Sequence, residues 1–149
     1  MPVDALEPII ILHRPVALPD PKPDWDIAAS PFLPELKREY GNGISYERAK
    51  IKYLLGHTSL SKYQFVRMDY VYNGERTAQH LRKKYRQRFD EIVTAQDFID
   101  DIASISTGWR RPYLALPGDG LAYSTGDILS YELSRLEAFI DEEMGSSLK

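Results

Sequence analysis

The sequence predicts a mainly helical α+β protein, with about five helices around one core, one β-hairpin near residues 111–124 and an extended N-terminal arm. Apolar residues recur at steps of three and four along several segments, which is typical of amphipathic helices. A Gly-Asp-Gly turn separates two short apolar runs, which indicates the hairpin. Eight of the ten prolines fall within the first 34 residues, so that stretch favours an extended chain.

The chain divides into an arm, residues 1–30, and a single helical domain, residues 31–149. Length (149 residues), hydrophobic content (43%) and charged content (28%) fit one ordinary globular domain. Within the arm, residues 8–15 can supply one short strand, and the proline-rich stretch after them favours polyproline II. Trp25 is the expected anchor of the arm, either on its own domain or on a partner.

Two helices are expected at the start of the domain. The first begins with Ser30 as its cap and Pro31 at its first position, and it runs to residue 40. The second is capped by Ser45 and ended by Gly56. Residues 60–72 suit either a strand or a helix, and helix is the preferred prediction because apolar residues keep helical steps.

A strongly basic helix follows over residues 76–92. Its apolar stripe is predicted to face the core and comprises Ala78, Leu81, Tyr85, Phe89 and Ile92. Thr94 and Asp97 then form a capping box for a short helix over residues 98–105.

Two further elements complete the prediction. Residues 111–124 form the hairpin, with a four-residue turn at 117–120. Ser124 and Asp127 cap a last helix that ends at Gly145. Its apolar face comprises Ile128, Leu129, Leu133, Leu136, Ile140 and Met144.

Charge is distributed unevenly along the chain, although the net charge is only −3. Residues 1–36 carry net −4, residues 37–88 net +9 and residues 89–149 net −8. The favoured interpretation is that folding pairs the basic helix with Asp90, Glu91 and the acidic C-terminal helix. The alternative is a molecule with separated charge, which binds nucleic acid or associates with copies of itself.

The basic helix is the first candidate binding site, for nucleic acid or for an acidic partner. Its candidate residues are Arg76, His80, Arg82, Lys83, Lys84, Arg86 and Arg88. A sequence pI near 5.6 argues against a dedicated nucleic-acid domain, which usually has a pI above about 9.

A second candidate surface, for a protein partner, precedes the hairpin. Trp109, Arg110, Arg111 and Tyr113 are of the types that dominate binding hot spots, and Trp25 joins them as the anchor of the arm. The alternative is a core tryptophan flanked by arginines whose aliphatic stems cover apolar surface.

The sequence contains no motif typical of a catalytic site or a metal site. Without cysteine there is neither a thiolate nucleophile nor a disulfide. His13, His57 and His80 lack metal-ligand spacing, and Gly118-Asp119-Gly120 lacks the phosphate-loop pattern. We therefore expect no enzyme, no metal and no cofactor. No apolar run has the length of a membrane span, so an intracellular setting, or a place in an assembly such as a virion, is expected.

Residues 54–61, LLGHTSLS, resemble the LLGHxSxS segment of the tyrosine recombinases (phage integrases). The resemblance covers about a tenth of the chain and implies that His57 supports a scissile phosphate. The family's nucleophilic tyrosine would fall at Val66, however, and its arginines have no counterpart upstream. The resemblance thus implies at most a degenerate fragment without catalytic residues.

Taken together, these patterns lead to one functional hypothesis with two alternatives. We expect a non-catalytic interaction or assembly protein, such as a phage virion component or a mobile-element accessory factor, that docks on a protein partner or on its own copies. The first alternative is a nucleic-acid-binding protein that uses residues 76–88. The second is the degenerate recombinase fragment.

Overall fold

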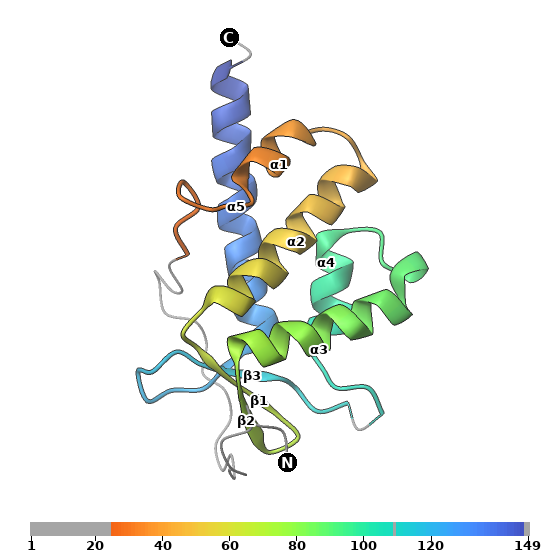
Figure 1. Ribbon diagram of the computed structural model, residues 1–149, viewed down its shortest axis with the longest axis vertical. Helices are drawn as coiled ribbons and strands as arrows, with labels where there is room; N and C mark the ends of the chain where they lie inside the picture. Colours follow the sequence, from red (N-terminus) through yellow and green to blue (C-terminus); the bar gives the residue numbers. More distant parts are fainter. Residues whose placement is uncertain (1–24, 109, 148–149) are drawn as a thin grey trace.

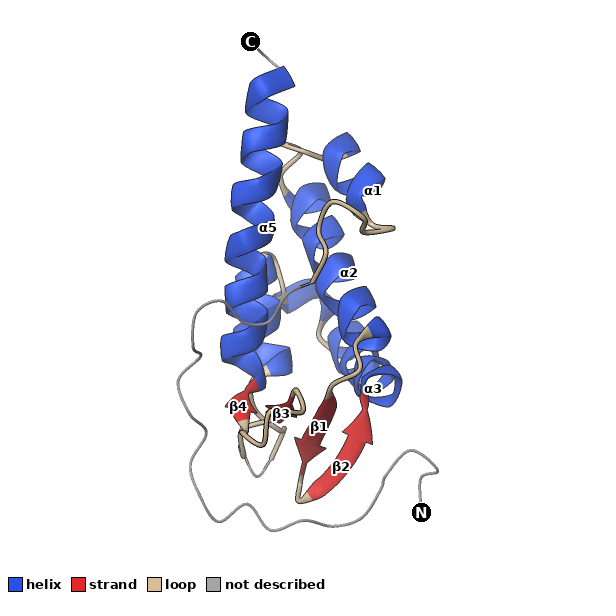
Figure 2. Ribbon diagram, turned by 90° about the vertical axis from the view of Figure 1, so that its left-hand side faces the viewer, coloured by secondary structure: helices blue, strands red, loops and turns tan. Residues whose placement is uncertain are grey.

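The computed structural model describes residues 25–108 and 110–147, which form five α-helices and one four-stranded antiparallel sheet (Figure 1). The mainly helical α+β fold class is therefore confirmed. The helices are α1 (Leu33–Arg38), α2 (Ile44–Leu60), α3 (Gly74–Gln87), α4 (Ala95–Phe98) and α5 (Thr125–Ser147). The strands are β1 (Gln64–Arg67), β2 (Tyr70–Asn73), β3 (Leu114–Leu116) and β4 (Tyr123–Ser124). Figure 2 shows the sheet at one end of the molecule, with α2 and α5 extending away from it.

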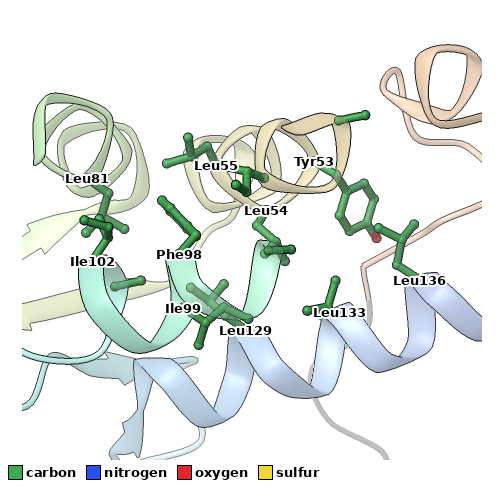
Figure 3. Packing of buried hydrophobic residues seen from close by; sticks show 14 of the residues in the cluster. Tyr53, Leu54, Leu55, Leu81, Phe98, Ile99, Ile102, Leu129, Leu133 and Leu136 are labelled. Carbon is green, nitrogen blue, oxygen red and sulfur yellow. The ribbon is translucent and has the colours of Figure 1, made fainter. Parts of the chain in front are cut away.

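The main core lies between α2, α4 and α5. In Figure 3, leucines of α5 such as Leu129 and Leu133 face Tyr53 and Leu54 of α2, with Phe98 beside them. The apolar face predicted for the last helix is confirmed, since five of its six residues are buried and Met144 packs at the edge of the core. Within the described residues, no helix combines the length and the apolar character needed to cross a bilayer.

The arm predicted over residues 1–30 lies outside the described residues as far as position 24. Residues 25–30 pack on the helical domain. Trp25 is 9% exposed, its backbone N–H donates to Glu132 at 3.2 Å, and its ring stacks on His57. The tryptophan thus forms part of the domain's own core.

The helix α1 begins later than predicted. Phe32 precedes its first residue and Pro34 lies in its first turn, so Pro31 is outside the helix. The Ser30 hydroxyl accepts a hydrogen bond from the Phe32 N–H at 3.2 Å. Ser30 therefore stabilises the turn before the helix and not the helix itself.

The helix α2 continues through Gly56, which was wrongly predicted to end it. Gly56 has helical backbone, and a β-carbon there would overlap the ring of Phe32. Close packing explains this glycine, whereas a left-handed turn does not. The predicted cap at Ser45 is also wrong, because Gly43 precedes the helix and no side chain caps it. The recombinase-like segment 54–61 is thus almost entirely helical.

The preferred prediction of a helix over residues 60–72 is wrong. The strands β1 and β2 form a tight hairpin there, in which Phe65 pairs with Tyr72. Met68 and Asp69 at its tip have φ of 53° and 69°, as a two-residue type I′ turn requires. The apolar spacing fitted both periods, and pairing with β3 decides for the strand.

The basic helix α3 is shorter than predicted. It is capped at its start by Asn73, which accepts from the Arg76 N–H at 2.8 Å, and it ends at Gln87. One 3₁₀ turn, Phe89–Glu91, follows. Of the predicted stripe, Ala78, Leu81 and Ile92 are buried and Tyr85 is partly buried, whereas Phe89, in the 3₁₀ turn, is 37% exposed.

The capping box at Thr94 is confirmed, and it starts α4, which continues as a π-helical turn over Ile99–Ala103. The predicted hairpin near residues 111–124 is confirmed as β3 and β4, although six residues connect the strands. The sheet order is β2-β1-β3-β4, so this hairpin pairs with the first one. The helix α5 passes through Gly145, where an end was predicted, and reaches Ser147.

Candidate functional site

A cleft of about 760 Å³ lies between α3, the β1–β2 hairpin and the loop that leads into β3. Such a volume is within the usual range for small-molecule sites, about 300–1,000 Å³. The helix α3 follows β2 directly and lies beside this hairpin (Figure 1). The hairpin lines the cleft with Phe65, Val66, Arg67, Met68 and Tyr72, and the loop lines it with Ser106, Thr107 and Tyr113.

The charged side chains in this cleft are all basic. They are Arg67, Arg76, Lys83, Lys84 and Arg86, and the described residues that line it include no aspartate or glutamate. Arg76, Lys83 and Arg86 lie on one face of α3, because residues spaced by three, four or seven lie above one another on a helix. Like charges held this close repel one another, so a negative counter-charge in the cleft would stabilise the arrangement.

Lys84 forms the floor of the cleft. The residue is only 7% exposed, and its Nζ donates to the carbonyl oxygens of Ile102 and Ile105, both at 2.8 Å, and to the Tyr113 hydroxyl at 3.2 Å. Burial lowers the pKa of Lys84 to about 8, with the positive charges of Arg88 and Arg67 adding to the effect. Its three N–H donors are therefore all used within the protein.

His80 lies one turn before Lys84 and also contacts Tyr113. Its Nε2 is 3.2 Å from the Tyr113 hydroxyl, and the two rings meet edge to face. Burial and, after it, the neighbouring cations, Arg67 first among them, together lower the pKa of His80 to about 4. The ring is therefore neutral near pH 7. Burial also raises the pKa of Tyr113, so its hydroxyl remains protonated.

Arg67 lies opposite these residues, on β1. Its guanidinium lies 5.1 Å from the centre of the Tyr72 ring and donates to the Tyr72 hydroxyl at 3.5 Å. The side chain is partly buried and forms no ion pair with any described residue. A partly buried arginine without a carboxylate partner is a recognised anion-binding feature, because its planar fork matches the oxygens of phosphate and carboxylate groups.

An ion pair joins two of the elements that form the cleft. Arg111 donates through two nitrogens to the two carboxylate oxygens of Asp69, at 2.7 and 3.2 Å. This bidentate pair joins the tip of the β1–β2 hairpin to the loop before β3. It therefore helps to hold the two walls of the cleft at a fixed separation.

The structure brings together most of the residues predicted on the basic helix. Arg76, His80, Lys83, Lys84 and Arg86 line the cleft. Arg82 and Arg88 do not line it, and Arg88 instead pairs with Glu91 at 2.9 Å.

The favoured charge pairing of the basic helix is found in part: the helix pairs with Glu91, but no ion pair among the described residues joins it to the acidic C-terminal helix α5. The Glu91 pair is the one ion pair that the described residues give to this basic stretch. The acidic groups of α5 pair with earlier members of the basic segment 37–88: Glu137 with Lys50 at 2.7 Å, and Glu143 with Lys37 at 3.7 Å. The basic and acidic segments therefore do meet on folding, away from the basic helix.

The second predicted surface is divided by the structure. Trp109 lies outside the described residues, Arg110 is exposed, Arg111 is held by Asp69, and Tyr113 is buried at the cleft. Trp25, predicted with them as an interface residue, is buried in the core against His57 and Tyr53.

Arg67 and Tyr72 are the site residues that sequence analysis missed. Both lie in the segment wrongly assigned to a helix, and a helix would have placed them on unrelated faces. The available signal was the alternation of Phe65 and Arg67 along one strand face, opposite Tyr72.

His57 belongs to a separate, structural cluster. Its Nε2 is 2.7 Å from the Ser30 hydroxyl, and the rings of Trp25, Tyr53 and Phe32 surround it. Burial lowers its pKa. The contacts attach residues 25–32 to α2.

The comparisons with known proteins identify a family. Residues 45–141 match the family described as "Family of unknown function (DUF5329)", which covers the cleft, its walls and most of α5. A relative, "Uncharacterized protein YfeK" of Salmonella typhimurium, is 35% identical over 75 residues, which are 50% of this chain and 62% of that protein. The aligned part thus spans less than two thirds of the relative's length. No solved structure matches the chain.

Proposed function

The chain belongs to this family of unknown function, DUF5329, and we propose that it is a non-catalytic protein that binds an anionic ligand in the basic cleft. The observation that carries the proposal is the composition of the lining: five basic side chains and no carboxylate among the described residues that form it.

The location of these charges favours a ligand held inside the cleft. Arg67 and Lys84 are drawn in from the surface, and removing charged groups from water is unfavourable unless an opposite charge or hydrogen bonds compensate. Lys84 has its compensation in two carbonyl groups and a hydroxyl. Among the described residues, Arg67 has only the weak contact with Tyr72, so an incoming oxyanion would supply the counter-charge that these residues do not.

A nucleic-acid duplex is the less favoured ligand for this shape. A duplex is bound most simply by basic side chains on a convex face that reaches the backbone, whereas several of these cations converge on a cleft. The assembly role predicted from the arm and the charge polarity stays a prediction, and its two tryptophans support it less, since one is buried and the other lies outside the described residues.

The test is binding of small anions, measured by isothermal titration calorimetry at low salt. Inorganic phosphate, pyrophosphate and tripolyphosphate form one series, and a random 12-base-pair duplex is the probe for the alternative. We expect affinity to rise along the series. Arg67→Gln and Lys83→Gln should each weaken tripolyphosphate binding by about tenfold, the equivalent of about 1.4 kcal/mol.

The matched control is Arg82→Gln, which removes the same charge from the same helix outside the cleft. We expect it to change the affinity by less than about twofold, because Arg82 makes no direct contact with the cleft and its charge is screened by solvent. Equal losses in the Arg82 and Arg67 variants would show general attraction to the surface and would contradict the proposal. Binding of the duplex without binding of the small anions would replace it with the nucleic-acid alternative.

A further inference from the structure

Three side chains at the floor of the cleft form one chain of hydrogen bonds with a defined direction. Lys84 can only donate, because an ammonium group has no acceptor, so the Tyr113 oxygen accepts from it. The Tyr113 proton then needs an acceptor of its own. His80 Nε2, at 3.2 Å, is the one acceptor that the described residues offer this hydroxyl.

This direction fixes the tautomer of His80. A buried hydroxyl proton without a partner is unfavourable, so Tyr113 donates to Nε2. The ring of His80 is neutral at pH 7, and a neutral imidazole that accepts at Nε2 carries its proton at Nδ1. Nδ1 makes no hydrogen bond to any described residue, and His80 lines the cleft.

Resting on the function proposed above, we infer that His80, oriented by Tyr113 and Lys84, is a specificity residue of the cleft: its Nδ1–H donates to an oxygen of a bound oxyanion next to Arg67. The group recognised is a phosphate or carboxylate oxygen. The neutral donor adds direction to a site whose other contacts are charges, because a ligand without an acceptor oxygen at this position would leave the N–H unpaired.

The aromatic rings that line the cleft indicate whether the ligand includes a nucleobase. Stacking on a nucleobase requires a free ring face. Arg67 lies over the ring of Tyr72, and the Lys84 ammonium lies 5.0 Å from the centre of the Tyr113 ring. These two rings and the ring of Phe65, which also lines the cleft, are themselves buried. The ligand class is therefore a compact oxyanion, recognised by its acid groups and not by a stacked base.

The first experiment measures the tautomer of His80 directly. Long-range ¹H–¹⁵N NMR of the full chain should show His80 as the Nδ1–H tautomer near pH 7, and pyrophosphate should shift its Nδ1 resonance on binding. Tyr113→Phe should give a mixture of the two His80 tautomers and weaken pyrophosphate binding by about fivefold to tenfold, the loss expected for one hydrogen bond. Tyr70→Phe, an exposed tyrosine on the neighbouring strand, is the control and should change neither.

A second pair of variants keeps the inference testable if Tyr113→Phe does not fold. The amide nitrogen of asparagine occupies nearly the place of Nδ1, and that of glutamine the place of Nε2. We expect His80→Asn to retain pyrophosphate affinity better than His80→Gln, by at least threefold.

The outcomes separate this inference from the proposed function. Suppose that pyrophosphate binds in calorimetry. The role of His80 is then overturned, and anion binding stands, if His80 is the Nε2–H tautomer, if its Nδ1 resonance does not shift on binding, or if His80→Gln binds as well as His80→Asn. If no small oxyanion binds, both are overturned.

Discussion

Lys84, on the basic helix, donates a 2.8 Å hydrogen bond to the carbonyl oxygen of Ile102 in the π-helical turn. The contact joins two elements 18 residues apart. A π turn leaves backbone carbonyls outside the regular helical pattern, and Lys84 donates to that of Ile102 and to that of Ile105, two residues after the turn. A residue that the sequence suggests as an exposed charge is therefore part of the framework under the cleft.

This contact predicts that Lys84→Met is destabilising. Methionine keeps the length of the stem but leaves two carbonyl groups and a hydroxyl without their donor, so the free energy of unfolding should fall by about 1–3 kcal/mol. Urea denaturation measures the change. Lys83→Met, the exposed neighbour, is the control and should stay within about 0.5 kcal/mol. Equal effects of the two variants would show that the buried ammonium is not structural.

The close approach of Phe32 to α2 predicts the effect of an alanine at position 56. Alanine is normally the better helix former, but its β-carbon would overlap the Phe32 ring, so Gly56→Ala should destabilise the protein by about 1–3 kcal/mol. Gly145→Ala is the matched control, because α5 has open space there. That variant should be neutral or stabilising by up to about 1 kcal/mol. A stabilised Gly56→Ala, measured by thermal unfolding, would refute the packing explanation.

The hairpin tip predicts a stabilising change. Met68 holds a left-handed backbone, φ 53°, which strains a residue with a side chain by about 1 kcal/mol. Met68→Gly should therefore raise the free energy of unfolding by up to about 1 kcal/mol. Asp69→Gly relieves the same strain at φ 69° but removes the ion pair with Arg111, so its gain should be smaller. Destabilisation by Met68→Gly would exclude strain at the tip.

Acid should weaken the fold in part through His80. The folded protein holds the pKa of His80 at about 4, below its usual 6.5, because burial and the charges of Arg67, Lys84, Lys83 and Arg76 all oppose protonation. Between these two pH values the unfolded chain binds more protons, so the stability that neutral His80 contributes is present above pH 6.5 and is lost as the pH falls towards 4.

Comparing wild type with His80→Asn separates the effect of His80 from the effect of the carboxylates, which titrate in both proteins. Wild type should lose about 1–2 kcal/mol more than His80→Asn between pH 6.5 and 4.5, after allowance for solvent screening. Urea denaturation at several pH values measures both curves. Parallel curves would mean that His80 protonates normally in the folded protein.

Several elements could be predicted from the sequence because local patterns decide them. The capping box at Thr94 fixes the start of α4 through contacts within four residues. The last helix has a long run of apolar residues at helical steps, and no strand of that length could bury them on one side. The Gly-Asp-Gly turn likewise marks the hairpin of β3 and β4, whatever packs around it.

Other features depend on residues far away in the chain. Gly56 has the signature of a helix end, and only the ring of Phe32 explains why the helix continues past it. Residues 64–73 satisfy both the helical and the strand period, and the choice follows from pairing with β3, about fifty residues later. Arg67 was missed as a site residue for this reason.

The sequence by itself determined a mainly helical fold, the apolar faces that build the core and a concentration of positive charge on one helix, since composition and short-range spacing are enough for these. Only the tertiary structure decided where that charge acts. In the folded chain Lys84 donates to backbone carbonyls, Arg67 lies across the cleft from His80 and Tyr113, and the acidic helix α5 pairs with Lys50 and not with the basic helix. Burial and hydrogen-bond direction depend on which surfaces meet, and these are properties of the folded chain.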